Sequence, residues 1–433
     1  MRKLALMCLA LLLAALWLPG LAAAEPKEIK IGAIYPLTGG AAAEGRELRA
    51  GVELAVEIAN NVMSGIDMDM AKNGGIKSLG GAKIKVIFKD HQGNPQLGAD
   101  LAKKLIEDDH VVGILGCYHS SVTKTVAAVC ERFGVPMIND SSTSPSLTKS
   151  GFKWFWRTTP HDTQFTKDLF DFMKGLTEGK AKGVAPVPMA DIKTLAAACE
   201  KTEWGTNVSD TIKQYAGEYK FNLAANLLYA AKSPDLSAEV QSLKAVNPGA
   251  MLFASYTSDA ILMIKTLQSM KAAPKLLWGQ DAGFEAPEFA ATLGDLTEGI
   301  LTRTVFTPQV AKVKKVAGQV NDLYKKKHGI DLSGPSARSF TGLQTWVYIL
   351  EKAGSTDPKA IQAAANSITI PGEQLVVPWF GIKFATTGDD IGQNTLGTGM
   401  IGQYQKKDGK INLEIVYPFE LATSNLIYPF KGF

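Results

Sequence analysis

The chain has 433 residues, of which 46% are hydrophobic, 20% are charged and 8% are aromatic. This length predicts more than one domain, and the apolar content suffices for a sizeable core, which excludes a globally disordered chain. The formal net charge of +4 falls to +2 without residues 1–24, because that segment holds Arg2, Lys3 and no acidic residue. Such a small charge gives no field for nucleic acid. The clustered lysines are interpreted as a solvated helix face: Lys312, Lys314, Lys315 and Lys325 to Lys327.

Residues 1–24 have the pattern of a cleaved secretory signal peptide. Arg2 and Lys3 form its positive region, residues 4–18 form an uncharged apolar run, and Ala22-Ala23-Ala24 places small residues at the cleavage position. Cys8 lies inside the apolar run, where it makes a poor lipoprotein signal. No later segment is apolar over a length that would span a bilayer. We therefore expect an exported, soluble, periplasmic protein after cleavage.

The first part of the chain alternates strands and helices. Strands are expected at residues 28–35, 83–88, 111–115 and 135–138, and helices at residues 46–60, 95–108 and 122–133. Residues 63–81, which glycines and acids interrupt, are expected to form a surface excursion. The alternation is typical of a parallel sheet with helices on both faces.

The alternation restarts after residues 157–160. Further strands are expected at residues 194–198, 222–227, 250–254 and 275–278, with residues 294–306 as a strand and connector. Helices are expected at residues 165–176, from the end of Glu203-Trp204-Gly205 to about residue 215, and at residues 238–246, 259–270, 311–327, 336–352 and 358–368. Short strands are expected in the tail, at residues 399–405 and 412–416.

These elements predict an α/β fold of two Rossmann-like lobes with parallel-sheet cores. The three late helices have no sheet of their own, so we assign them to the first lobe. The chain then crosses between the lobes three times, near residues 159, 305 and 376. Lobe 1 is predicted to comprise residues 25–159 and 305–376, and lobe 2 residues 160–304 and 377–433.

Two clusters of hydroxyl residues follow neighbouring strands of the first lobe. Ser120, Ser121 and Thr123 follow the strand at 111–115, and residues 141–144 (Ser-Ser-Thr-Ser) follow the strand at 135–138. Ligands of open parallel sheets bind outside the carboxyl ends of the strands. A helix that begins there offers unpaired N–H groups and the positive end of its dipole to an anion. We interpret the two clusters as one half of a small-molecule site.

Other chemistry-bearing residues favour no enzyme, metal or cofactor. His119 beside Ser120 suggests a hydrolase, but adjacent side chains at a strand end point apart and no G-x-S-x-G motif occurs. The five histidines are scattered, without metal-ligand spacing. Residues 397–402 match G-x-G-x-x-G, yet no helix is expected to begin there, so they are interpreted as a turn. The remaining cysteines are odd in number and are interpreted as buried thiols: Cys117, Cys130 and Cys199.

The order of these motifs resembles the periplasmic substrate-binding proteins of ABC importers, in particular the branched-chain amino acid (Leu/Ile/Val) binding family. The resemblance rests on residues 29–39, on Gly74-Gly75-Ile76, on the two hydroxyl clusters and on residues 151–158, and it extends over residues 28–375. It implies a type I two-lobe fold whose hinged lobes close on a ligand. It also implies a monomer that delivers the ligand to an ABC permease in the inner membrane.

The resemblance also implies roles for individual residues. In the family, a serine that matches Ser120, with Ser121 beside it, holds the ligand's carboxylate together with backbone N–H groups. A carbonyl and a hydroxyl that match Ser142 and Thr143 hold the ammonium group, and a second-lobe acid that matches Asp281 completes that site. A family tyrosine that matches Tyr256 reaches the ligand from lobe 2.

Several positions depart from the family pattern. Trp204 stands in place of a tyrosine, Glu44 in place of a frequent aromatic, Tyr118 in place of a leucine, and Ser336 lies near a phenylalanine position. The family's lobe 1 disulfide has no counterpart, because Gln92-Gly93 replaces one cysteine. These changes predict a more polar pocket. An amino acid or amino-acid-like ligand is expected, and a polar or cationic side group, an amide or urea-like compound, an aromatic acid, and a ligand-sensing role for a receptor stay open.

Overall fold

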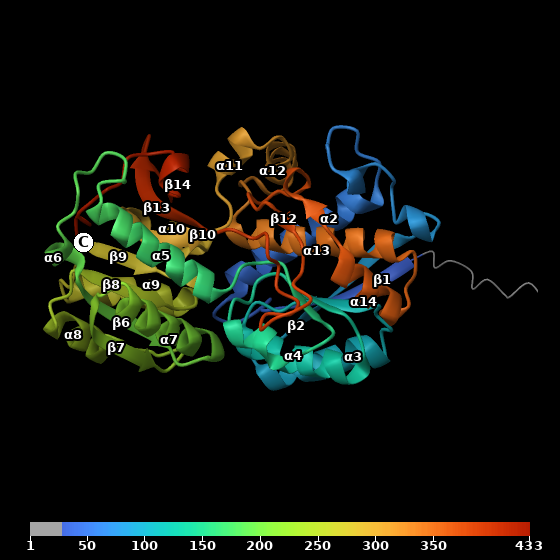
Figure 1. The fold of residues 1–433 in the computed structure, drawn as a ribbon, viewed down its shortest axis with the longest axis horizontal. Helices are drawn as coiled ribbons and strands as arrows, with labels where there is room; N and C mark the ends of the chain where they lie inside the picture. Colours follow the sequence, from blue (N-terminus) through green and yellow to red (C-terminus); the bar gives the residue numbers. More distant parts are fainter. Residues whose placement is uncertain (1–27) are drawn as a thin grey trace, which may run out of the picture.

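The computed structural model of the chain describes residues 28–433, so the predicted signal peptide lies outside the described residues. These residues form two α/β lobes that lie side by side (Figure 1). No helix among them is both long and apolar enough to cross a bilayer. We call the lobe built on the first sheet lobe 1 and the lobe built on the second sheet lobe 2.

Lobe 1 contains a five-stranded parallel sheet in the order β2-β1-β3-β4-β5. Its strands are β1 (Glu28–Tyr35), β2 (Lys83–Asp90), β3 (Gly113–Gly116), β4 (Met137–Asn139) and β5 (Phe155–Arg157). Its helices are α2 (Ala42–Asn60), α3 (Pro95–Glu107), α4 (Ser120–Phe133), α13 (Gly334–Ala353) and α14 (Pro358–Ser367). Side chains of β1 alternate between the two faces, since Ile31 and Ala33 join the core under α2 and α13 whereas Ile34 joins the core under α3 and α4.

Lobe 2 contains a seven-stranded mixed sheet in the order β14-β13-β10-β9-β8-β6-β7. The parallel strands are β6 (Thr194–Glu200), β7 (Asn222–Tyr229), β8 (Ala250–Ala254), β9 (Leu276–Gly279) and β10 (Leu301–Thr304). An antiparallel hairpin of β13 (Met400–Lys407) and β14 (Lys410–Tyr417) extends one edge. Its helices are α5 (Asp162–Thr177), α6 (Met189–Ile192), α7 (Glu203–Glu218), α8 (Ser237–Ala245), α9 (Thr257–Ser269) and α10 (Pro287–Leu293).

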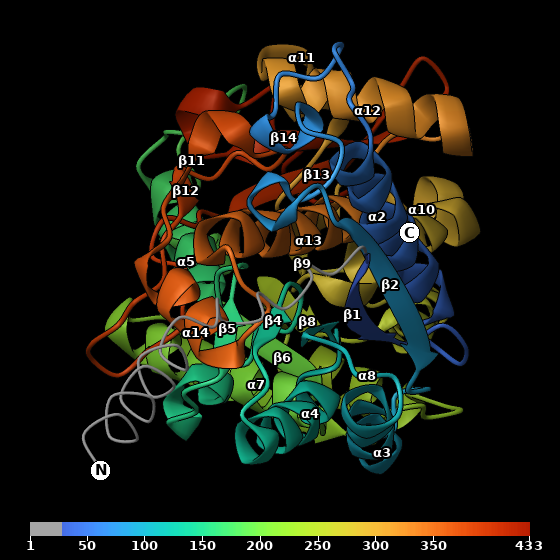
Figure 2. The same ribbon diagram turned by 90° about the vertical axis from the view of Figure 1, so that its right-hand side faces the viewer.

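The late helix α13 packs against α2 of lobe 1. In Figure 2, α13 lies beside α2 over the first sheet, and these two helices share extensive contacts. Gly51 of α2 permits this approach, because a Cβ at that position would overlap the backbone carbonyl of Ser336 in α13. The arrangement of two sheets with helices on their faces confirms the predicted fold class.

The segment 63–81 differs from the sequence prediction, because it is not a surface excursion. It contains two short 3-10 turns, and it buries six apolar side chains against the core of lobe 1: Ile66, Met68, Met70, Ala71, Ile76 and Leu79. The segment also packs against α13, which comes about 270 residues later in the chain. The burial depends on that distant helix and is therefore invisible in the local glycine-rich pattern.

Other elements also differ from the prediction. The strand β5 and the helices α6 and α10 are not expected from the sequence, and the single helix predicted at residues 311–327 is divided into α11 (Pro308–Val313) and α12 (Lys315–His328). Lys314 adopts an extended backbone between them, and its ammonium group donates to the carbonyls of Gly372 at 2.7 Å and Val377 at 2.6 Å. This tertiary contact interrupts a run of residues that would otherwise favour a single helix.

The predicted crossing near residue 376 is also misplaced. After the short strands β11 (Ile370–Pro371) and β12 (Gly381–Ile382), the chain pairs with the edge of the first sheet, where Gln393 bridges to Arg157. The Arg157 side chain donates to Gln393 Oε1 at 2.6 Å. The chain reaches the second sheet only at Met400, so the segment 381–394 lies with lobe 1. The predicted crossings near residues 159 and 305 fall in the connections after β5 and β10.

The contact between β3 and α13 provides a test of the packing of lobe 1. A Cβ on Gly113 would overlap the Trp346 ring and approach the Pro136 carbonyl to 2.8 Å. We expect Gly113→Ala to lower the free energy of unfolding by about 1–3 kcal/mol, because the buried ring must move. Gly217→Ala is the control, since an added Cβ on this exposed residue of α7 meets no atom within 4 Å. Urea unfolding measures both variants, and equal midpoints would contradict this packing.

Candidate ligand-binding site

Four aromatic rings from both lobes meet where the carboxyl ends of the two sheets face each other. Tyr118 and His119 follow β3 of lobe 1, whereas Trp204 lies in the first turn of α7 and Tyr256 precedes α9 in lobe 2. The Tyr256 ring centroid lies 5.5 Å from Tyr118, 4.3 Å from His119 and 4.9 Å from Trp204. We call these four residues the aromatic cluster. It brings together three residues predicted from the sequence, Tyr118, Trp204 and Tyr256.

The start of α4 lies beside the aromatic cluster. Ser120 is buried, and its hydroxyl accepts a long hydrogen bond of 3.4 Å from the Ser144 N–H. Ser121 is partly buried and lines a pocket of about 80 Å³ with His119 and Tyr256, among other residues of both lobes. No side chain caps the first turn of α4. The backbone donors of that turn and the positive end of the helix dipole are therefore available to an anionic group.

The second hydroxyl cluster serves partly to hold lobe 1 together. The Ser142 hydroxyl donates to the Tyr118 carbonyl at 2.8 Å and lies 2.5 Å from the Thr123 hydroxyl, so it fixes the loop that carries Tyr118. The Thr143 carbonyl accepts from the Asp162 N–H at 2.9 Å, across the crossing into lobe 2. By contrast, the buried hydroxyl of Ser141 forms no hydrogen bond of regular geometry among the described residues, although it lies near enough to Asp140 to lower the pKa of that carboxyl. Ser141 is the free hydroxyl here, although the sequence favours Ser142.

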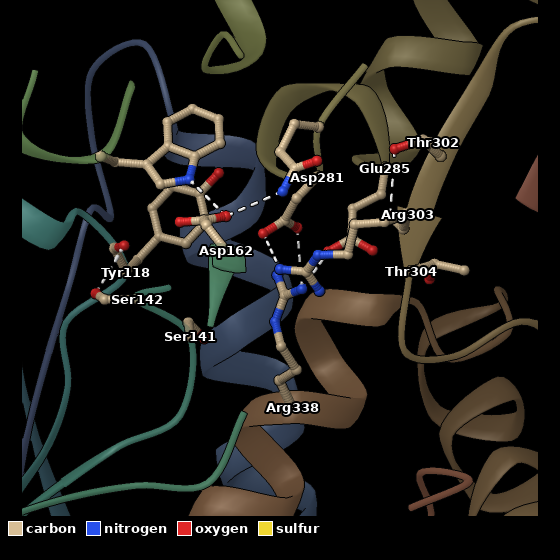
Figure 3. A network of polar contacts seen from close by, with 12 residues as sticks. Tyr118, Ser141, Ser142, Asp162, Asp281, Glu285, Thr302, Arg303, Thr304 and Arg338 are labelled. Carbon is tan, nitrogen blue, oxygen red and sulfur yellow. Dashed lines mark hydrogen bonds and ion pairs between the residues drawn. The ribbon is translucent and has the colours of Figure 1, made fainter. Parts of the chain in front are cut away.

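Asp281 lies in a buried group of four charged residues, which we call the charge cluster. Its carboxylate contacts Arg303 of β10 and accepts from Arg338 of α13 at 3.1 Å, and Arg338 also contacts Glu285 (Figure 3). Burial opposes ionisation of Asp281, but the Arg303 and Arg338 guanidinium groups outweigh it and hold its pKa below the usual range. Asp281 is therefore already paired, which the sequence did not indicate.

The charge cluster joins the two lobes. Arg338 rises from α13 of lobe 1, whereas Asp281, Glu285 and Arg303 belong to lobe 2 (Figure 3). Glu285 reaches Arg338 because Gly334, at the start of α13, has no side chain, and a Cβ there would overlap the Glu285 carboxylate. With the lobes in contact across the cleft, the structure has the closed arrangement.

Glu44 makes a second contact between the lobes. It lies in the first turn of α2, and it is fully buried. The Thr257 hydroxyl of lobe 2 donates to its Oε1 atom, and its Oε2 atom has no partner among the described residues. Burial raises the pKa of Glu44 from its ordinary value of 4.5 to about 7. At this position, where the family often has an aromatic residue, the chain thus has a buried carboxylate with one oxygen that accepts no hydrogen bond among the described residues.

Asp162 is a candidate site residue that is not expected from the sequence. It is the first residue of α5 and is fully buried, and its Oδ1 atom accepts from Gln280 Nε2 at 3.1 Å and from Trp204 Nε1 at 3.4 Å. Its Oδ2 atom has no partner among the described residues, and burial raises its pKa. The sequence does hold one indication of this role, an acidic residue at the start of a helix directly after a lobe crossing. It is missed because the helix is predicted to begin at residue 165, three residues after Asp162.

The remaining candidates have structural roles. Ser336 is buried and forms a reciprocal hydrogen-bonded cap with Ser333 at the start of α13. Burial lowers the pKa of His119 well below its ordinary value, so its imidazole is neutral, and none of the hydrogen bonds in residues 28–433 joins it to Ser120. The described residues contain no group of His, Cys, Asp or Glu that could hold a metal ion. The described cysteines are free and buried: Cys117, Cys130 and Cys199.

The chain is similar to known proteins over most of its length. The sequence profile of the family described as "Periplasmic binding protein" matches residues 28–396. The Leu/Ile/Val-binding protein homolog 7 of Brucella suis biovar 1 (strain 1330) is 28% identical over 421 residues, which cover 94% of this chain and 96% of that protein.

Solved structures show the same fold. A leucine binding protein, LivK, from Thermotoga maritima matches with a TM-score of 0.70 at 20% identity and covers 91% of this chain and 100% of that chain. A solute binding protein of an ABC transporter from Rhodopseudomonas palustris BisB5, in complex with 3,4-dihydroxy benzoic acid, matches with a TM-score of 0.72 at 19% identity and covers 93% of this chain and 99% of that chain. The chain belongs to the family of periplasmic binding proteins. It is similar in sequence to a Leu/Ile/Val-binding protein homolog and in fold to a leucine binding protein. The resemblance expected from the sequence is confirmed.

The shifted pKa of Glu44 predicts how stability depends on pH. The folded protein binds more protons at Glu44 than the unfolded chain does between pH 4.5 and 7, so its contribution is fully present below pH 4.5 and is lost as the pH rises through 7. We expect the free energy of unfolding of Glu44→Gln, relative to that of the wild type, to rise by up to about 3 kcal/mol between pH 5 and pH 8. Urea unfolding across this range measures the gain. Glu53→Gln, at an exposed position of the same helix, is the control. If the free energies of unfolding of Glu44→Gln and the wild type changed with pH in parallel, the raised pKa of Glu44 would be contradicted.

Arg338 should be essential to the closed arrangement. Arg338→Met leaves Glu285 without its cation and should lower the free energy of unfolding by about 3–5 kcal/mol, because a buried carboxylate is then unpaired. Arg46→Met removes another cation that faces the other lobe, but the Arg46–Glu288 pair is exposed at 3.9 Å, so we expect no measurable loss. Urea unfolding at pH 7 compares the two variants. A loss for Arg46→Met as large as that for Arg338→Met would argue against the charge cluster as the main tie between lobes.

Proposed function

We propose that the protein binds a small polar solute, an amino acid or an amino-acid-like compound, and delivers it to an ABC permease of the inner membrane. The observation that carries this proposal is the set of buried polar atoms without partners in the contact region between the lobes. This set includes donors and acceptors: the Tyr118 and Ser141 hydroxyls, the Glu44 and Asp162 carboxylates, and N–H groups of Arg303 and Arg338. Buried polar groups normally have partners, so their absence here indicates where a solute binds.

The ends of an amino acid match this set. The uncapped start of α4, with Ser120 and Ser121, suits a carboxylate, as the family resemblance implies. Thr143 and a second-lobe acid suit the ammonium group, because a buried cation needs an anionic partner and further acceptors. The aromatic cluster then encloses the rest of the solute. Closure of the lobes over the solute supplies the form that a permease distinguishes from the empty protein.

An aromatic acid is the second candidate. The rings of the aromatic cluster and the two buried arginines favour it, and one of the similar structures holds 3,4-dihydroxy benzoic acid. However, Asp281 and Glu285 already contact Arg303 and Arg338, so these two arginines are partly occupied by protein carboxylates. We therefore favour the amino-acid class.

The same proposal places the mature protein in the periplasm without a catalytic role. The family is periplasmic, and residues 1–24 have the signal-peptide pattern that export requires. We further propose that the protein acts as a monomer and that the permease recognises its closed form. The contacts that join the two lobes lie within a single chain, which supports this proposal.

Two hydroxyl deletions test the site. Tyr118→Phe and Ser141→Ala each remove a buried hydroxyl that has no partner, so neither should lower the stability of the ligand-free protein. Each should weaken solute binding about three- to tenfold, because the solute loses a hydrogen bond. Ser142→Ala is the contrasting control: it should lower stability by about 1 kcal/mol, because its hydroxyl bonds inside lobe 1.

The assay begins with mass spectrometry of the small molecule that co-purifies with the mature protein. After that molecule is removed, thermal unfolding with amino acids, amides and aromatic acids shows which solutes bind, because a ligand of the native state raises the melting temperature. No stabilisation by any solute would refute the proposed function. Unchanged affinity in both hydroxyl variants would refute this placement of the site.

A further inference from the structure

We propose, on the basis of the proposed function, that the solute carries a net positive charge and that Glu44 of lobe 1 and Asp162 of lobe 2 both bind its donor groups. The chemical class is a basic amino acid or a similar amine or guanidine. The two carboxylates come from opposite sides of the lobe contact, so such a solute would hold the lobes together.

The two carboxylates share one geometry. Each lies in the first turn of a long helix, Glu44 in α2 and Asp162 in α5, where the helix dipole favours a negative charge. Each is fully buried, and each has one oxygen that accepts hydrogen bonds from the protein. In each the second oxygen has no partner among the described residues. A cationic donor is the group that satisfies such an oxygen best, because hydrogen bonds between ions are the strong ones.

No ion pair among residues 28–433 joins either of these two acids to a protein cation. In the charge cluster, Arg303 and Arg338 contact Asp281 and Glu285 instead. Two buried cations, Arg303 and Arg157, act on Asp162 without forming an ion pair with it. The Arg303 guanidinium contacts Asp281 and lies over the Phe165 ring at 3.7 Å. The Arg157 guanidinium donates to Gln393 and to the Ser144 carbonyl, each at 2.6 Å. A neutral zwitterion supplies one ammonium group and leaves one of the two acids unpaired. A solute with a second cationic group pairs with both.

The aromatic cluster supports the same ligand class. Trp204 donates to Asp162 at 3.4 Å, and its ring lies against Tyr256, whose ring in turn lies against Tyr118. The charge of Glu44 is among the causes that raise the pKa of Tyr118, so Tyr118 lies near that carboxylate. Faces of Trp and Tyr rings attract cations, most strongly where water is excluded. An aromatic or aliphatic solute without a cation would use the rings but would bury both carboxylate oxygens unpaired.

Protonation gives the proposal a second readout. Burial raises the pKa of Glu44 to about 7, and the groups that act on it are Glu288, Arg338 and Tyr118. Asp162 faces Arg303, Arg157, Asp281 and Tyr256, and burial raises its pKa although the Gln280 and Thr143 side chains and Arg303 oppose the rise. A cation favours the ionised carboxylates and releases protons on binding, so its affinity should increase from pH 6 to pH 8. An anionic solute would take up protons, and its affinity should decrease over the same range.

Isothermal titration calorimetry of the ligand-stripped mature protein tests the inference. The probes are L-arginine, L-lysine and agmatine, compared with L-leucine and benzoate. We expect at least one basic probe to bind ten times more tightly than L-leucine and benzoate, and to release protons when titrated in buffers of different ionisation enthalpy. Glu44→Gln and Asp162→Asn keep the side-chain shape and should each weaken that binding at least tenfold. Glu53→Gln, on the exposed side of α2, should leave it unchanged.

The outcomes separate this inference from the proposed function. Tighter binding of L-leucine or benzoate than of every basic probe would overturn the inference and leave the proposed function intact. Unchanged affinity in both Glu44→Gln and Asp162→Asn would also overturn it, provided that thermal unfolding shows both variants folded. Absence of binding by all five probes would overturn it as well, and only the wider solute screen then decides on the proposed function.

Discussion

The contact of Arg338 with Asp281 and Glu285 is the interaction on which the arrangement of the two lobes depends. It is the contact at which a cation from the long helix of lobe 1 enters a buried acidic pair of lobe 2. Burial of ions is costly unless they are paired with good geometry. The cluster therefore specifies one relative placement of the lobes, since any shift along the contact would separate Arg338 from one carboxylate. The positions of the aromatic rings and of Glu44 against Thr257 follow from that placement.

The site contains two kinds of buried carboxylate, and the difference gives a physical account of closure. Asp281 and Glu285 have cations, whereas Glu44 and Asp162 each keep an unused oxygen in the closed arrangement. Closing the empty protein removes those oxygens from water without compensation, which opposes closure. A solute that supplies the missing donors shifts the equilibrium toward the closed form by its differential affinity for that form. Residues that lack partners thus make closure depend on the solute.

The sequence predicted the fold well because the fold depends on local patterns. β1 and β8 match their predicted bounds, and α13 packs against α2. Part of the site was also accessible, since Tyr118, Trp204 and Tyr256 do meet. Asp162, Arg303 and Arg338 were not found, because their roles arise from pairing across the lobe contact. A charged residue in a buried strand, such as Arg303, is the one local sign that a partner must exist.

Asp281 shows why a matched motif position does not transfer a role. The sequence places an acid where the family has one, and the structure places that acid in the contact region between the lobes. Its partners, however, are two arginines that lie outside the motif, so its charge is compensated within the protein. Glu44 and Asp162 form no ion pair with a cation among residues 28–433, and we therefore propose that they, rather than Asp281, hold a cationic solute. On this proposal, specificity depends on which buried charges the protein leaves without an ion pair, a property set by residues from both lobes.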